Sequence, residues 1–359
     1  MLRYMGTCNT IAFLMKPVNA PRKVLAIETS CDETSVALVE KRRDHLVVRA
    51  QVIASQIPLH AKTGGVVPEV AARAHEHKII PLVAKTLAKA AVLPKDISAI
   101  AVTQGPGLLT SLLVGATAAK TLAAVWQKPL IPVHHLLGHT AAAWLGRDFR
   151  SFSYPMVILI VSGGHTELWT SSKLGAWRFL GRTRDDAAGE AFDKTAKMLG
   201  LGYPGGPAIS RMAEHGNAQK FPLPRPLAAS SDYDFSFSGL KTSVKYLHEA
   251  QTPRVKKSPV YVRDLAASIE RAIVDALVGK CLKAIAHIQP KTLILAGGVA
   301  ANTLLRKTLA QHAADKGINF AVPDKTYCTD NAAMIGAAAL LFPRVVPRNW
   351  QASSRLKIV

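Results

Sequence analysis

The sequence predicts an α/β protein built from two duplicated lobes that face each other across a cleft. The first observation is a strand, polar turn and strand at residues 24–39, a pattern that recurs at 156–170. The second is a strand that leads through glycines into a long apolar helix, at 99–126 and again at 292–314. The third is the alternation of strands with helices, which is typical of parallel or mixed sheets covered by helices.

In the first lobe, short apolar runs bounded by polar turns predict strands at residues 24–27, 35–39, 46–54 and 99–103. Apolar residues spaced three and four positions apart predict helices at 70–93 and 109–126. The second lobe repeats this order, with strands at 156–161, 167–170 and 292–296 and helices at 265–288, 300–314 and 331–341. The charged stretch 245–257 is interpreted as a solvated connection.

These elements divide the chain into a first lobe at 24–150 and a second lobe at 151–342, whose last helix is expected to pack back on the first lobe. Residues 1–23 precede the lobes, and 343–359 form a C-terminal tail. The length of 359 residues, 49% of them hydrophobic, suffices for two cores. No uncharged apolar run reaches the roughly 18 residues of a spanning helix, which excludes an integral membrane protein. Four cysteines without a C-x-x-C pair exclude a disulfide scaffold and a thiolate zinc knuckle.

The charge of the chain indicates a polyanionic partner or an organellar matrix. Lys and Arg number 45 against 24 Asp and Glu, for a formal net charge of +21 and a pI near 10.0. Such an excess attracts nucleic acid, but mitochondrial matrix proteins are basic whatever they bind. Aromatic residues are only 6% of the chain, so folded RNA fits better than single strands stacked on rings.

The amino-terminal segment is also basic. Residues 1–27 contain Arg3, Lys16, Arg22 and Lys23 but no acid. A basic, acid-free start with scattered apolar residues is typical of an organellar transit peptide. The alternative is a disordered tail of the bacterial kind.

Glycine-rich turns follow several of the predicted strands, at 105–107, 162–165, 205–206 and 297–298. Glycine lets backbone N–H groups approach a phosphate, and a following helix N-terminus favours the anion. Because the sequence lacks the P-loop and Rossmann patterns, the duplication favours a nucleotide held between two lobes, as in actin-like and sugar-kinase ATPases. Asn302 begins the helix after 297–298, where it can serve as a cap or a ligand.

A dense acidic cluster lies at residues 185–194. On a helix, Asp186, Glu190, Asp193 and Lys194 would share one broad face. In one interpretation Asp193 accepts a hydrogen bond from a sugar hydroxyl, and Asp186 or Glu190 orients substrate. In the other, the cluster is a capped helix with intrahelical ion pairs.

Two histidines predict a metal site. His135 and His139 are spaced i and i+4, on one face of a helix, where they can bind one metal ion. Asp330, at the start of the last helix, could supply a third ligand from across the cleft. Two histidines and one carboxylate suit iron or zinc. No Glu follows His135, so the general base of a zinc protease is missing.

A series of short motifs occurs in an order that is typical of one family. The motifs are IETSCDET at 27–34, GGVVPE at 64–69, HxxxH at 135–139, VSGGHT at 161–166, DDAAGEAFDK at 185–194, YPGGP at 203–207, FSFSGLKT at 235–242 and TDN at 329–331. Over residues 24–342 the chain therefore closely resembles the universal tRNA threonylcarbamoyladenosine-forming transferases, once called O-sialoglycoprotein endopeptidases.

The resemblance implies an actin-like ATPase (ASKHA) fold, with two duplicated ribonuclease-H-like lobes around a central cleft. It implies transfer of a threonylcarbamoyl group from threonylcarbamoyl-AMP to the N6 amine of the adenosine 3′ of the anticodon, in tRNAs reading codons that begin with A. By resemblance, iron or zinc would be bound by His135, His139 and Asp330. The adenylate, or ATP with magnesium in the same cleft, would be held by Val161, Ser162, Gly163, Gly164, His165, Asp193, Gly206 and Asn302. Ser210 stands where some members have a ribose-binding acid, so it is left out of that set.

The resemblance of residues 1–27 to a transit peptide and the net charge of the chain together indicate the mitochondrial member of the family. Such a protein would act in the matrix as a homodimer, with tRNA as substrate, a separate threonylcarbamoyl-AMP synthase upstream and no membrane partner. Bacterial and cytosolic relatives need protein partners instead. The alternatives are a metalloprotease, a small-molecule kinase on the same fold, and a basic RNA-binding scaffold without catalysis.

Overall fold

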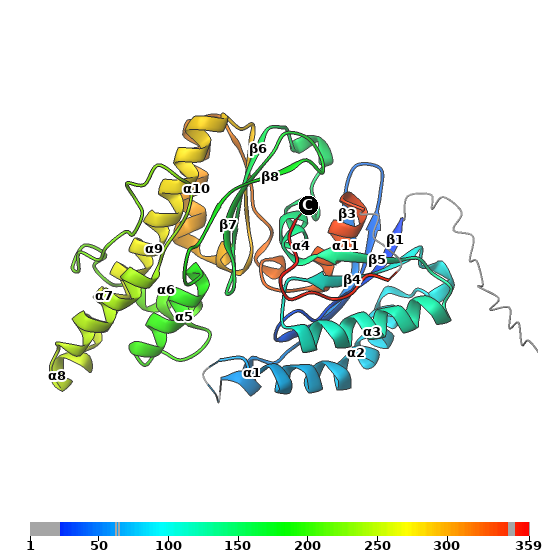
Figure 1. Ribbon diagram of the computed structural model, residues 1–359, viewed down its shortest axis with the longest axis horizontal. Coiled ribbons are helices and arrows are strands. Elements are labelled where there is room, and N and C mark those ends of the chain that lie inside the picture. Colours follow the sequence, from blue (N-terminus) through cyan, green and yellow to red (C-terminus); the bar gives the residue numbers. More distant parts are fainter. Residues whose placement is uncertain (1–21, 62, 64, 344–348, 359) are drawn as a thin grey trace, which may run out of the picture.

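Two five-stranded β-sheets form the centre of the protein, shown as a computed structural model in Figure 1. The structure describes residues 22–61, 63, 65–343 and 349–358, so most of the predicted transit peptide lies outside the described residues. The first sheet has the order β3-β2-β1-β4-β5, with β1 at Lys23–Glu28, β2 at Glu33–Lys41, β3 at Leu46–Ser55, β4 at Ala99–Gly105 and β5 at Leu130–His134. The second has the order β10-β9-β6-β7-β8, with β6 at Met156–Val161, β7 at Thr166–Ser171, β8 at Trp177–Arg182, β9 at Thr292–Ala296 and β10 at Asn319–Ala321.

The two sheets share one topology, which confirms the predicted duplication. β1 pairs antiparallel with β2 and parallel with β4, just as β6 pairs antiparallel with β7 and parallel with β9. The central strands are apolar throughout because both of their faces are covered. In β1, Leu25 and Ile27 enter one core, whereas Val24 and Ala26 enter another.

Helices flank both sheets, on their outer faces and in the space between them. In the first half of the chain they are α1 (Ile57–His60), α2 (Pro68–Ala90), α3 (Leu109–Val125) and α4 (His135–Ala141). In the second half they are α5 (Ala188–Met198), α6 (Gly205–Ala213), α7 (Ser238–Glu249), α8 (Pro253–Lys256), α9 (Pro259–Ile288), α10 (Thr303–Asp315) and α11 (Ala332–Leu341). Helices α2 and α3 pack on the first sheet, and α5, α9 and α10 pack on the second. No helix of the described residues is long and apolar enough to span a bilayer.

Helices α4 and α11 lie between the two sheets and belong to a core that both lobes share. This core contains Val24 of β1, Ile158 of β6, Leu136 of α4 and Ile335 of α11. The two helices can approach closely because a Cβ atom on Gly138 would lie 2.8 Å from the side chain of Ile335. Helix α11 therefore packs on β1 and β2, although it comes from the far end of the chain.

The structure corrects the prediction for residues 245–257. This stretch is not a connection, because α7 continues to Glu249 and α8 occupies Pro253–Lys256. Strands β5, β8 and β10 were not predicted either. β10 has only three residues, and β8 is an edge strand with exposed positions, so neither carries a clear apolar pattern.

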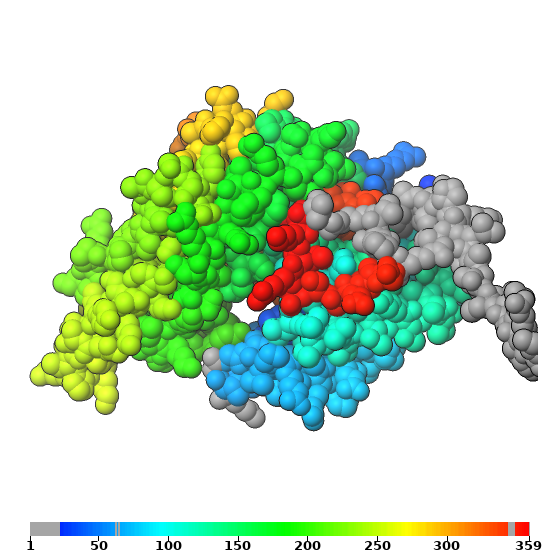
Figure 2. All heavy atoms as spheres, viewed as in Figure 1, coloured from blue at the N-terminus to red at the C-terminus, as the bar shows by residue number. Residues whose placement is uncertain are grey.

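The described part of the C-terminal tail packs on the first lobe. Trp350 is 7% exposed and joins the core under α2 and α3, with the ammonium of Lys120 4.6 Å from its ring centroid. The N–H of Ser353 donates to the carbonyl of Gln104 at 2.9 Å, beside the turn that follows β4. Figure 2 shows this segment, in red, on the surface where the first lobe borders the second.

Candidate metal centre and substrate cleft

His135 and His139 lie on α4, which directly follows β5. Nδ1 of His134 accepts the N–H of Leu136 at 3.2 Å and so caps the helix. Every residue of α4 is buried, and the exposed fractions of His135 and His139 are 5% and 1%. The core between the sheets therefore fixes both imidazoles on one face of the helix.

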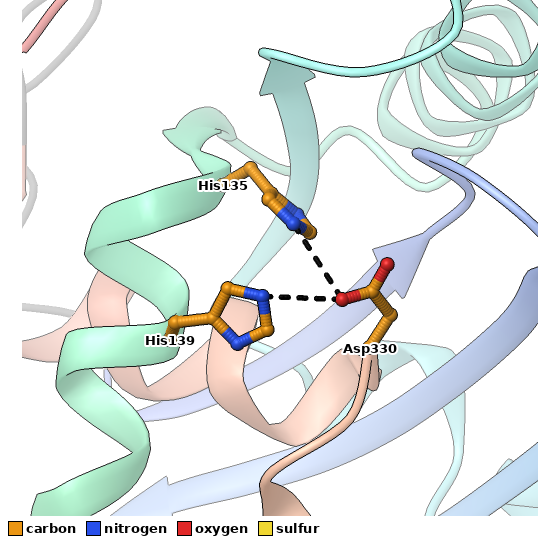
Figure 3. Close-up of side chains that lie close together, drawn as sticks. All are labelled: His135, His139 and Asp330. Carbon is orange, nitrogen blue, oxygen red and sulfur yellow. Dashed lines mark ion pairs between the residues drawn. The ribbon is translucent and has the colours of Figure 1, made fainter. Parts of the chain in front are cut away.

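Asp330 approaches the two histidines from the segment before α11 (Figure 3). Asn331 fixes this segment because its side chain accepts the N–H of Met334 at 3.0 Å and caps α11. Oδ1 of Asp330 lies 3.1 Å from Nε2 of His139 and 3.5 Å from Nε2 of His135. All three ligand atoms lie within 4.8 Å of one another. The structure thus brings together the three residues that the resemblance assigns to a metal.

The geometry at His139 fits a metal ion better than a hydrogen bond. Its Nε2 is fully buried and makes no hydrogen bond, although Oδ1 of Asp330 is 3.1 Å away. Such an arrangement is expected when a lone pair on Nε2 of His139 and one on Oδ1 of Asp330 both point at a shared ion rather than at each other. Two imidazoles and one carboxylate are a donor set that suits iron or zinc.

The charges of this cluster also favour a cation. Burial disfavours the charged form of Asp330, but the adjacent His135 and His139 outweigh it and hold the pKa of Asp330 below its ordinary value. Burial likewise disfavours the imidazolium of His135, but Asp330 and Glu28 outweigh it and raise the pKa of His135 to about 9. A metal ion would take the place of this proton.

Glu28, at the end of β1, supports the metal ligand His135 from behind. Its Oε2 lies 3.3 Å from Nδ1 of His135 and accepts the hydroxyl of Thr103 at 2.7 Å. The other carboxylate oxygen accepts the N–H of Ser30 at 2.5 Å. A carboxylate on the second ring nitrogen fixes which nitrogen faces the metal. Glu28 was not predicted to have a role, although an acid directly after the apolar run 24–27 is a usable sequence signal.

In the second lobe, Val161 to His165 form the turn between β6 and β7. Oγ of Ser162 accepts the N–H of His165 at 3.1 Å, which closes the turn. A Cβ atom on Gly163 or Gly164 would have open space around it. By contrast, a Cβ atom on Gly189 of α5 would lie 2.5 Å from the carbonyl of Ser162, so α5 supports the turn from below. The turn therefore presents free backbone to a ligand.

The acidic cluster at 185–194 is only partly helical. Asp185 and Asp186 precede α5, so the prediction that Asp186 shares a helical face with Glu190 is wrong. Nζ of Lys194 lies 2.8 Å from both Asp186 and Glu190, which favours the ion-pair interpretation for these two acids. Asp193 instead faces α6, where its Oδ1 accepts the N–H of Gly205 at 2.7 Å.

Asn302 is the N-cap of α10, which confirms that part of the prediction. Its side chain accepts the N–H of Leu305 at 2.8 Å. Its amide nitrogen donates to Glu270 at 2.7 Å and to Ser210 at 3.1 Å. Gly206 is the second residue of α6 and directly follows Gly205, whose N–H donates to Asp193. The adenylate residues assigned by resemblance thus lie on the β6–β7 turn and on three helices of the second lobe.

Titratable side chains of the two lobes lie within electrostatic reach of one another. Burial, reinforced by the charges of His135 and His139, lowers the pKa of His165 to about 4. Burial, reinforced by Asp32 of the first lobe and Asp193 of the second, raises the pKa of Tyr203. The turn at His165 in the second lobe therefore lies within electrostatic reach of His135 and His139, which come from the first lobe.

Fold and site together define a two-lobed α/β protein with a His-His-carboxylate cluster on one side of its cleft and glycine-rich turns on the other. Residues 47–337 match the family described as TsaD, tRNA N6-adenosine threonylcarbamoyltransferase. The chain belongs to this family and is an acyltransferase that modifies tRNA.

Curated relatives agree with this assignment, and a solved structure shares the fold. The chain is 50% identical over 317 residues to the tRNA N6-adenosine threonylcarbamoyltransferase of Anaeromyxobacter sp., covering 88% of this chain and 93% of that one. It is 48% identical over 327 residues to that of Moorella thermoacetica, covering 91% and 93%. The fold resembles HypF of T. kodakarensis, with a TM-score of 0.59 and 14% identity over 90% of this chain and 48% of that one. These findings support the two-lobed actin-like fold.

Proposed function

We propose that this protein transfers the threonylcarbamoyl group of threonylcarbamoyl-AMP to the N6 amine of the adenosine 3′ of the anticodon, in tRNAs reading codons that begin with A. The observation that carries the proposal is the convergence of His135, His139 and Asp330, within electrostatic reach of His165 on the open glycine turn. One lobe can hold the acyl end of the substrate and the other its nucleotide.

The substrate is a mixed anhydride and is therefore already activated. In the reaction the N6 amine attacks the carbamoyl carbon, the bond from that carbon to the phosphate oxygen breaks, AMP leaves, and the amine proton passes to solvent. Iron or zinc held by His135, His139 and Asp330 would polarise and orient the acyl group. The N–H groups of the β6–β7 turn would bind the phosphate, and Asp193 and Asn302 would position the nucleoside. The mechanism needs no side-chain nucleophile.

Reconstitution tests this reaction directly. Purified protein is incubated with an adenylate-forming synthase, threonine, bicarbonate, ATP and an unmodified tRNA, and the digested nucleosides are measured by mass spectrometry. Threonylcarbamoyladenosine is expected with wild type and with the exposed control Asp315→Ala, but not with Asp330→Ala. Absence of product, even with added bacterial partner proteins, would favour the kinase alternative. Chelator-sensitive cleavage of a protein substrate would favour the metalloprotease.

The proposed homodimer is supported by an apolar groove between α2 and α3. Ile80 and Leu113 line it with exposed fractions of 54% and 48%. Exposed apolar side chains that are grouped in this way are typical of protein interfaces. Leu113→Asp is expected to give a monomer in light scattering, whereas Leu174→Asp, exposed elsewhere, is expected to leave the dimer intact. A monomeric wild type would contradict the proposal.

A mitochondrial matrix location, with an upstream synthase as functional partner, is the last element of the proposal. It is supported by the acid-free residues 1–27 and by the net charge of +21, which also suits binding to the tRNA backbone. Import of the full chain into isolated mitochondria, with loss of import when residues 1–23 are removed, is the expected result. A full chain that stays outside would refute the location but not the reaction.

A further inference from the structure

A buried carboxylate in the second lobe is not used by the chemistry described so far. Glu270 lies on α9 and is 8% exposed. Its Oε1 accepts the hydroxyl of Ser210 at 2.6 Å and the amide of Asn302 at 2.7 Å. Both donors are neutral, and among the described residues no lysine or arginine pairs with Glu270. A carboxylate buried in this way requires further hydrogen bonds to compensate for lost hydration.

The second oxygen of Glu270 is open to a ligand. Within the part of the chain that the structure describes, no group donates to Oε2. It is also not enclosed, because the fully buried side-chain atoms without a partner are Oγ of Ser111 and the ring nitrogens of His139. Oε2 therefore still contacts solvent, so that a donor from outside the protein can reach it.

The position of Glu270 relates it to the nucleotide site. Ser210 lies one turn after Gly206 on α6, so the two residues share a face of that helix. Asn302 begins α10 directly after the turn that starts at Gly297. Glu270 bonds to both residues and thus joins the two elements assigned to hold the adenylate.

The neighbours of Glu270 select a neutral donor rather than a cation. A cation such as magnesium needs several oxygen ligands. Oδ1 of Asn302 is occupied by the N–H of Leu305, and its amide hydrogens are directed at Glu270 and Ser210. These hydrogens carry positive partial charge and repel a cation, whereas a hydroxyl group can donate to Oε2.

We propose that Oε2 of Glu270 accepts a hydrogen bond from a ribose hydroxyl of the bound adenylate. This rests on the proposed function only in placing a nucleotide in the cleft. Some family members have a ribose-binding acid on α6, where this chain has Ser210, and Glu270 supplies the carboxylate from α9 instead. The bond lets the protein discriminate ribonucleotides from nucleotides without sugar hydroxyls.

Calorimetric titration with AMP and with 2′,3′-dideoxy-AMP tests the assignment, without metal, tRNA or turnover. Wild type is expected to bind AMP about tenfold or more tightly than the dideoxy analogue, as expected for a hydrogen bond to a charged group. Glu270→Gln can keep the bonds from Ser210 and Asn302 on its oxygen while it removes the negative charge, so that a ribose hydroxyl can only make a neutral hydrogen bond with the NH2 group at the open position. In this variant the AMP preference is expected to fall by about threefold or more.

Two further variants complete the design. Adding Ser210→Asp to Glu270→Gln returns a carboxylate to the same site, because Oγ of Ser210 lies 2.6 Å from Oε1 of Glu270. This double variant is expected to regain the preference for AMP over the dideoxy analogue. Glu214→Gln, at the exposed end of α6, is the control and is expected to match wild type. A purely structural role would change folding stability but not the ratio of the two affinities.

The outcomes are distinct from those of the transfer assay. Equal binding of AMP and the dideoxy analogue by wild type, or an unchanged preference in Glu270→Gln, would overturn the assignment. AMP binding with normal discrimination but no threonylcarbamoyladenosine would refute the proposed reaction and leave Glu270 as a ribose-binding residue.

Discussion

Oε2 of Glu28 lies 3.3 Å from Nδ1 of His135, so the end of the first strand supports a ligand that comes more than 100 residues later in the chain. This contact orients the ring so that Nε2 faces Asp330. Glu28→Gln removes the negative charge while keeping the side-chain volume. Metal affinity is expected to fall about 10- to 100-fold, as measured by competition with a chelator. Glu69→Gln, which changes an exposed acid paired with Arg73, is expected to leave the affinity unchanged.

Metal binding is expected to stabilise the fold. Both ring nitrogens of His139 are buried without a hydrogen-bond partner, and an ion would satisfy Nε2. At a metal concentration 100 times the dissociation constant, linkage predicts about 2.7 kcal/mol of added stability. Thermal unfolding should therefore shift upward with iron or zinc in wild type but not in His139→Ala. The same upward shift in His139→Ala would place the metal elsewhere.

A methyl group at Gly189 is expected to disturb the β6–β7 turn. The new Cβ would lie 2.5 Å from the carbonyl of Ser162, so either α5 or the turn must move. Gly189→Ala should therefore weaken AMP binding at least tenfold in calorimetric titration. Gly279→Ala, on the exposed face of α9 with nothing within 4 Å, should bind AMP normally and gain up to about 1 kcal/mol of stability.

The ion pair at Asp232 gives a pH-dependent contribution to stability. Hydrogen bonds from the Ser230 hydroxyl, the Asp234 N–H and the buried Lys280 lower the pKa of Asp232 to about 2 from an ordinary value of 3.8. Since the folded-state pKa is depressed, the contribution is complete above about pH 4 and is lost as the pH falls towards 2. Asp232→Asn should lower the free energy of unfolding at pH 7, and this difference should shrink between pH 4 and pH 2.

Much of the fold could be predicted because the apolar pattern of each central element is local. The runs at β1, β4, β6 and β9 are fully buried strands, and their recurrence indicated the duplication. Helices α7 and α8 escaped prediction because a charged, solvated helix and a connection have similar composition.

The site was predicted unevenly for a related reason. The spacing of His135 and His139 marks a shared helical face in the sequence itself. The supporting acids Glu28 and Glu270 have partners on other elements, so no local spacing marks them. Glu270 lies on the buried side of α9, where a lone acid among apolar residues is the only sequence signal.

The position of α11 and of Trp350 also has a consequence for biosynthesis. The first lobe is translated first, but β1 and β2 stay uncovered on one face until α11 leaves the ribosome, and the other core of this lobe gains Trp350 later still. The lobe that begins the polypeptide is therefore the last to be completed. A nascent chain should expose the apolar face of β1 and β2 for nearly the whole of synthesis, which makes it a client for chaperones that bind emerging polypeptides.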